Sequence, residues 1–108
     1  MSMTELVSIL ETNGKGVRAY VECGREARRC ITEYPEQAIA YFLLAVTADR
    51  FVEAYDDQPL YSDKAEEAYL RFKKHVDQII RAEKENSDSV MLKTLNEMSV
   101  EIANHSHY

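Results

Sequence analysis

Hydrophobic side chains recur along the chain at intervals of three and four positions, in five stretches separated by short groups of turn-forming residues. This spacing is typical of α-helices that bury one face. The clearest stretch follows Ser62 and ends before a turn at residues 86–89. Its apolar positions are Ala65, Ala68, Tyr69, Phe72, Val76, Ile79 and Ile80. A narrower seam of the coiled-coil kind follows the turn, formed by Met91, Leu95, Met98 and Ile102.

The first two stretches predict a pair of helices joined by the Asn-Gly-Lys-Gly turn at residues 13–16. The first helix is expected to begin at Ser2, which forms a capping-box pattern with Glu5. The second helix is expected to run from about Val17 to Tyr34. The middle of its apolar stripe consists of small residues, namely Cys23, Gly24 and Ala27. This stripe predicts that a neighbouring helix approaches closely.

The third stretch, from Glu36 to about Tyr55, differs from the others because its first half is apolar on every face. Residues 38–46 read Ala-Ile-Ala-Tyr-Phe-Leu-Leu-Ala-Val without a polar side chain. A helix that is apolar all round has to be covered on most of its sides. We therefore expect the other helices to surround a central apolar helix at residues 38–48.

The length and the scarcity of helix breakers favour a single domain that spans residues 1–108. The chain has only three glycines and two prolines, and it contains no segment long enough to separate two domains. A chain of this size can bury one hydrophobic core without disulfides or metals. The sequence thus predicts an all-α fold, either a helical bundle or a short stack of helical hairpins, with about five helices.

Residues 35–45 resemble the junction between two tetratricopeptide repeats, whose units are antiparallel helix pairs. Tyr41, Leu44 and Ala45 stand where that family places an aromatic residue, a leucine and a small residue. Ala65, Tyr69 and Phe72 resemble the second helix of the repeat. The connection between the two helices is longer than in the family. The resemblance implies a scaffold that binds peptides or partner proteins. The Lys and Asn side chains with which some repeats hold a peptide carboxylate are missing from residues 38–48.

The formal net charge of −6 disfavours general phosphate binding, which requires clustered positive charge. The charge is unevenly spread. Residues 13–34 carry five basic and three acidic side chains, whereas residues 35–61 carry one basic and five acidic side chains. No signal peptide is recognisable, and the longest apolar run is about half the length of a membrane-spanning helix. We expect a soluble cytoplasmic protein.

No group of residues has the spacing of a catalytic or metal-binding motif, and we predict no catalytic residue, metal ligand or cofactor. Cys23 and Cys30 are two helical turns apart, too far for a mutual disulfide. His75 borders the apolar stripe of the fourth helix, where a structural role is expected. His105 and His107 make at most an incidental metal site. The Arg71 to His75 segment resembles the motif of the all-helical HEPN ribonucleases, but its gap is shorter.

The segment from Phe51 to Tyr61 combines aromatic and acidic residues at a helix end and in the loop that follows. Tyrosine makes strong contacts in protein interfaces, and carboxylates steer a basic partner. The alternative is that these aromatic side chains fold back and cover the end of the bundle. The predicted partner-binding residues are Phe51, Tyr55, Asp56, Asp57, Leu60 and Tyr61.

These observations favour a non-enzymatic adaptor or chaperone-like domain that binds another protein through its acidic and aromatic surface. A homodimer is compatible with this prediction. A first alternative is a small acidic inhibitor, such as an immunity protein, an antitoxin or a phage anti-defence protein. A second alternative is a helical RNA-binding or nuclease-like domain. Its candidate contacts are two basic clusters, Arg25, Arg28 and Arg29 on the second helix and Arg71, Lys74 and Arg81 on the fourth. The sequence does not identify the partner.

Overall fold

The computed structural model describes residues 3–105, and this part of the chain is 84% helical with five α-helices and no strand. The predicted all-α bundle is therefore confirmed. A 3₁₀ turn, η1 (Pro35–Gln37), leads into the third α-helix. In chain order the α-helices are α1 (Thr4–Thr12), α2 (Val17–Glu33), α3 (Ala38–Tyr55), α4 (Ser62–Lys84) and α5 (Asp88–Asn104).

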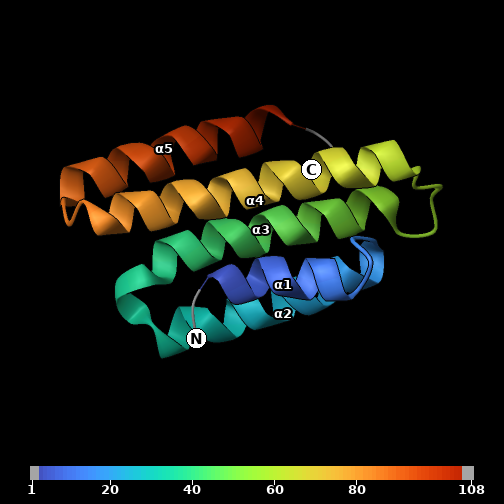
Figure 1. Ribbon diagram of the computed structural model, residues 1–108, viewed down its shortest axis with the longest axis horizontal. Coiled ribbons are helices and arrows are strands. Elements are labelled where there is room, and N and C mark those ends of the chain that lie inside the picture. The colour runs from blue at the N-terminus through green and yellow to red at the C-terminus, as the bar shows by residue number, and fades with distance from the viewer. Residues whose placement is uncertain (1–2, 106–108) are drawn as a thin grey trace.

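The first four helices run alternately up and down and enclose one core, and α5 lies outside this ring (Figure 1). α1 contacts α2 and α4, and α3 contacts the same two helices on the opposite side of the ring. α5 packs against both α4 and α3 and runs parallel to α3. The molecule measures 41 × 27 × 18 Å. α3 thus belongs to two layers, because it helps to enclose the core and also supports α5.

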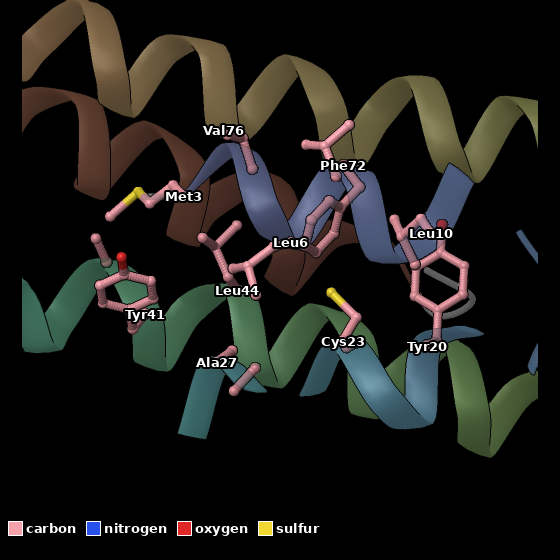
Figure 2. Close-up of a cluster of buried hydrophobic side chains, with 14 of the residues drawn as sticks. Met3, Leu6, Leu10, Tyr20, Cys23, Ala27, Tyr41, Leu44, Phe72 and Val76 are labelled. Atoms are coloured by element: carbon pink, nitrogen blue, oxygen red, sulfur yellow. The ribbon is translucent and has the colours of Figure 1, made fainter. Parts of the chain in front are cut away.

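The core forms where the apolar stripes of all four ring helices meet. Figure 2 shows Leu6 of α1, Leu44 of α3 and Phe72 of α4 pointing toward one another, and each of these side chains is fully buried. An aromatic group closes one end of the core. Tyr20 stacks on Phe51 with ring centroids 3.9 Å apart and meets the edge of Phe72 at 6.1 Å. Close packing of this kind supplies most of the stability of a small helical domain.

The small residues in the middle of α2 allow α3 to approach closely, as their spacing predicts. A Cβ atom added to Gly24 would lie 3.5 Å from the Cβ of Ala48 and 3.2 Å from a carboxylate oxygen of Asp49, both on α3. Cys23 and Ala27, on either side of Gly24, are fully buried. The α2–α3 pair is consequently the tightest helix pair of the fold.

The helix ends agree with the sequence in one case and differ in another. The side chain of Ser87 caps α5 by accepting a hydrogen bond from the backbone N–H of Val90 at 3.4 Å. The spacing of Asp63 and Glu66 predicts a capping box on α4, but that prediction is wrong. α4 begins at Ser62 without a side-chain cap, and Glu66 pairs with Lys15 instead. The predicted first-helix cap, Ser2, lies outside the described residues.

The cover over the apolar helix α3 is incomplete. α3 contacts α2, α4 and α5, which agrees with its predicted central position. The side chains of Ile39 and Phe42 are nevertheless 64% and 56% exposed. The expectation that the apolar half of this helix is enclosed by its neighbours is therefore wrong for one face, and the surface at this face has to be explained.

Candidate functional site

The aromatic and acidic segment predicted as the binding site is divided between the core and the surface. Phe51 is fully buried between Tyr20 and Tyr55, with the Tyr55 ring 4.8 Å away. Its prediction as a partner contact is wrong, because its side chain continues the inward stripe of α3. Leu44 and Ala48 precede it at helical spacing and are also fully buried. The alternative interpretation, in which aromatic side chains cover the end of the bundle, describes Phe51 and Tyr55.

The remaining predicted residues lie near the loop between α3 and α4. Leu60 is half-buried and lines a shallow hollow beside the turn that contains Lys15. Asp56, Asp57 and Tyr61 are exposed, and Tyr61 is 70% accessible. Asp57 adopts a left-handed backbone conformation, with φ of 58°. These three side chains are accessible to a partner. Phe51 and Leu60, the apolar members of the predicted set, are buried and half-buried.

A larger apolar surface lies where α3 and α5 run side by side near their N-terminal ends. Ile39 and Phe42 are one turn apart on α3, and such pairs lie on the same face of a helix. Leu92 of α5 is 59% exposed and lines the same hollow as Ile39. Single exposed apolar residues are common on protein surfaces, but neighbouring ones often mark an interaction site. We call the surface formed by Ile39, Phe42 and Leu92 the α3–α5 surface.

The hollow next to Ile39 has a volume of about 260 Å³. Its floor is apolar and includes Ala40, Ile79 and Leu95, which belong to three different helices. Pockets for drug-sized ligands and cofactors begin at roughly 300 Å³ and bury most of the bound molecule. The hollow is slightly smaller than that, so it suits one or two side chains that project from a larger partner.

Carboxylates line the hollow without basic neighbours in its wall. Glu36, Glu83 and Asp88 contribute to its lining, and no lysine or arginine does. Within residues 3–105, none of the three forms an ion pair with a basic side chain. Glu83 accepts a hydrogen bond from the neutral amide of Gln37. The α3–α5 surface is therefore apolar at its centre and negative at one end.

Three of the four arginines of α2 are in the opposite situation, because Arg25, Arg28 and Arg29 are each matched with carboxylates of the same chain. Arg25 pairs with Glu22 at 2.9 Å, and Arg28 pairs with Asp49 at 2.8 Å. Arg29 pairs with two carboxylates, from Glu26 and Glu33. These contacts neutralise the cluster that the sequence offers for RNA. The geometry gives a nucleic-acid function no support from this helix.

The buried titratable groups are placed for packing rather than for chemistry at a surface. His75 of α4 is fully buried, and its Nε2 lies 3.7 Å from a carboxylate oxygen of Glu101 on α5. The same carboxylate forms an ion pair with Lys74 at 3.4 Å. Burial lowers the pKa of His75 below its usual 6.5. Burial also raises the pKa of the Cys23 thiol to about 12 and that of Cys30 above its usual range. A thiol with a raised pKa is a poor nucleophile.

No group of three or more His, Cys, Asp or Glu side chains is placed to hold a metal ion in the part of the chain from 3 to 105. His107, one of the two histidines considered for an incidental site, lies outside the described residues. Within the described helices, none combines the length and the apolar character needed to cross a membrane.

Sequence reasoning missed the α3–α5 surface although a usable signal was present. Ile39, Phe42 and Val46 continue at helical spacing into Asp49 and Glu53, which are exposed. The charged half of α3 thus identifies the outward face, and extending that face toward the N-terminus places Ile39 and Phe42 on it. The uniform apolar character of residues 38–46 hid this periodicity. Leu92 has no such signal, because it lies beside the seam of α5 and not in it.

Comparisons of the chain with protein-family models, with curated proteins and with solved structures find no match. The resemblance of residues 35–45 to tetratricopeptide repeats consequently stays a prediction. Any functional interpretation depends on the geometry described above.

Proposed function

We propose that this chain is a protein-interaction domain that binds another protein through the α3–α5 surface. The observation that carries the proposal is the exposure of Ile39 and Leu92 at one hollow, with the exposed Phe42 one helical turn from Ile39 on the same face of α3. Leaving three large apolar side chains in water forfeits roughly 1.5–3 kcal/mol of possible burial for each. A partner that covers them recovers part of that free energy, and such anchors at the centre of an interface contribute most of the affinity.

The fold supports this role because the surface is supported from beneath. Ile39 and Phe42 stand on the helix whose inner face, with Leu44 and Phe51, forms the core. Side chains on a packed helix lose little conformational freedom when they bind, which reduces the entropic cost of association. The proposal thus retains the partner-binding function that the sequence favours, and it transfers the principal contacts from the loop at residues 56–61 to α3 and α5.

Affinity capture with matched variants tests the proposed surface. The full-length chain, Leu92→Asp and Val100→Asp serve as parallel baits in extracts of the native host, with quantitative mass spectrometry as the readout. Val100 is the control because it lies on the same helix, is 60% exposed and does not line the hollow. Both substitutions add one negative charge to an exposed position, so that a difference between them reports the location.

We expect at least one protein to be retained by the unmodified chain and by Val100→Asp but depleted about tenfold or more by Leu92→Asp, which corresponds to about 1.4 kcal/mol of binding free energy. The Ile39→Asp variant should deplete the same protein. If Leu92→Asp and Ile39→Asp retain every protein that the unmodified chain retains, the surface is not the binding site and the proposal is wrong.

The small acidic inhibitor is the second candidate, and the exposed loop favours it. Asp56, Asp57 and Tyr61 present two carboxylates and an aromatic ring to solvent without an ion-pair partner among residues 3–105. Such a group suits the basic active site of a nuclease or a toxin. Charge reversal at Asp56 and Asp57 in the same capture experiment distinguishes the candidates, because an inhibitor should lose its target with this change and keep it with Leu92→Asp.

A further inference from the structure

We infer that the occupant of the α3–α5 surface is an amphipathic helix with lysine or arginine beside its apolar residues. This inference rests on the proposed function, since it specifies the chemistry of the partner at the same surface. It follows from the shape of the surface and from the charge around it.

The shape favours a helix. α3 and α5 are parallel neighbours, and the groove between two such helices accepts the apolar ridge of a third. The molecule itself contains this arrangement, because α5 lies against α3 and α4 with its buried seam of Leu95, Met98 and Ile102. An added strand has nowhere to pair, since residues 3–105 contain no sheet edge. The hollow beside Ile39 and Leu92 then receives one large side chain of the incoming helix.

The charge favours a basic occupant. Glu36, Glu83 and Asp88 place three negative charges around the hollow. The N-terminal ends of α3 and α5 offset part of this, and the C-terminal end of α4 adds to it, each with about half a unit charge. The balance remains at roughly −2 to −3. Lys84 lines the adjacent hollow that shares Glu83, but it forms no ion pair with any of the three carboxylates. Lysine or arginine on the incoming helix would provide the missing partners.

The same charges argue against a second copy of this chain as the occupant. A two-fold dimer brings the same patch of both subunits together. Glu36, Glu83 and Asp88 would then lie near their own counterparts, and like charges across an interface are unfavourable. The chain also carries a net charge of −6, which opposes association of identical molecules.

Two synthetic peptides test the inference with the full-length chain. Both have about 18 residues, enough for a helix of several turns, and both carry leucine at intervals of three and four. The basic probe has lysine at its polar positions, and the acidic probe has glutamate there. Binding is measured by fluorescence anisotropy for the unmodified chain, Leu92→Asp, Val100→Asp and the double variant Glu36→Gln with Asp88→Asn, while circular dichroism confirms that each variant is folded.

We expect the basic probe to bind at least about tenfold more tightly than the acidic probe at low salt. The difference should shrink between about 0.01 M and 0.15 M salt, as the screening length falls from about 30 Å to about 8 Å. Leu92→Asp should weaken binding of the basic probe about tenfold, whereas Val100→Asp should leave it unchanged or slightly stronger. The directions matter, because simple attraction between opposite charges would make both variants bind more tightly. The double variant should lose most of the preference for the basic probe.

Four outcomes would overturn the inference: equal binding of the two probes, tighter binding to Leu92→Asp, an unchanged preference in the double variant, or no binding of the basic probe. Equal binding of both probes that is lost in Leu92→Asp would refute the basic partner while supporting the docking surface. If neither probe binds, the basic helix is refuted as the occupant. The proposed function is not refuted by that result, since the capture experiment tests it independently. Self-association through this surface, seen as a dimer in sedimentation velocity that Leu92→Asp abolishes, would replace the basic helix with a second copy.

Discussion

Two phenylalanines on α3, nine positions apart, should respond in opposite ways to truncation. Phe51 is fully buried and touches the rings of Tyr20 and Tyr55, whereas more than half of Phe42 is exposed. Removing a buried phenylalanine ring costs about 3–5 kcal/mol, and this includes the loss of its aromatic contacts. A domain of this size has a free energy of unfolding of roughly 5–15 kcal/mol. Phe51→Ala should therefore remove about a fifth or more of the total stability.

The cost of Phe42→Ala should be within about 1 kcal/mol. Only part of its ring is removed from water, and alanine is a better helix former than phenylalanine by a few tenths of a kcal/mol. A change of 1 kcal/mol moves the Tm of a domain of this size by roughly 4–8 °C. Phe51→Ala should consequently lower the Tm by about 12 °C or more, and Phe42→Ala by only a few degrees. Phe42→Ala should instead weaken partner binding in the capture experiment.

Chemical and thermal unfolding measure this difference. The chain contains no tryptophan, so far-ultraviolet circular dichroism of its helices is the appropriate signal. Equal costs for the two variants would show that Phe42 is buried within the chain, and the α3–α5 surface would then be ruled out as a docking site. A cost below about 1 kcal/mol for Phe51→Ala would show that the aromatic group is not part of the core.

Three further predictions follow from other parts of the bundle. Gly24→Leu should unfold or severely destabilise the chain because α3 lies against that position. Gly24→Ala should be nearly neutral in denaturant titrations, since its gain in helix propensity of about 1 kcal/mol offsets a tight contact with the side-chain carboxylate of Asp49, which pairs with Arg28. The pKa of His75 is lowered in the folded chain, so on acidification the unfolded chain binds a proton at this histidine first. Stability should therefore fall as the pH decreases below about 6.5. His75→Gln should reduce this pH dependence of stability in urea titrations at a series of pH values. Cys23, with its pKa raised to about 12, should react with a disulfide reagent near neutral pH only as fast as the chain opens, and mild denaturant should accelerate the reaction.

The fold was largely predictable because its signals are local and repeat many times. The stripes of α2 and α4 each present six or more apolar or small positions in register, and the turn at residues 13–16 separates two stripes clearly. The close approach of α3 to Gly24 was predictable for the same reason. The order in which helices surround the core was not, since it depends on which stripes pack together, and no pattern within one helix encodes that.

The prediction of Phe51 as a contact was wrong for a different physical reason. Phe51 is adjacent to acidic residues in the sequence, but in a helix a position is defined by the residues three and four places away. Leu44 and Ala48 place Phe51 inside, whereas Asp49 and Glu53 place Ile39 and Phe42 outside. Proximity along the chain favoured the wrong face. Asp56, Asp57 and Tyr61 are exposed because they follow the last turn of α3 or lie in the loop, and their role as partner contacts stays a prediction.

The α3–α5 surface differs from the rest of the molecule in its apolar exposure and in its charge. Leu70 and Val100 are also exposed apolar residues, but neither lines the hollow that Ile39 and Leu92 share. Arg25, Arg28 and Arg29 of α2 each have a carboxylate partner within the chain, whereas Glu36 and Asp88 have no basic partner among residues 3–105. Folding alone gives no reason to place the exposed side chains of Ile39 and Leu92 beside carboxylates that have no basic partner among residues 3–105. Local rules that fail together at one place are expected where a surface serves binding rather than folding.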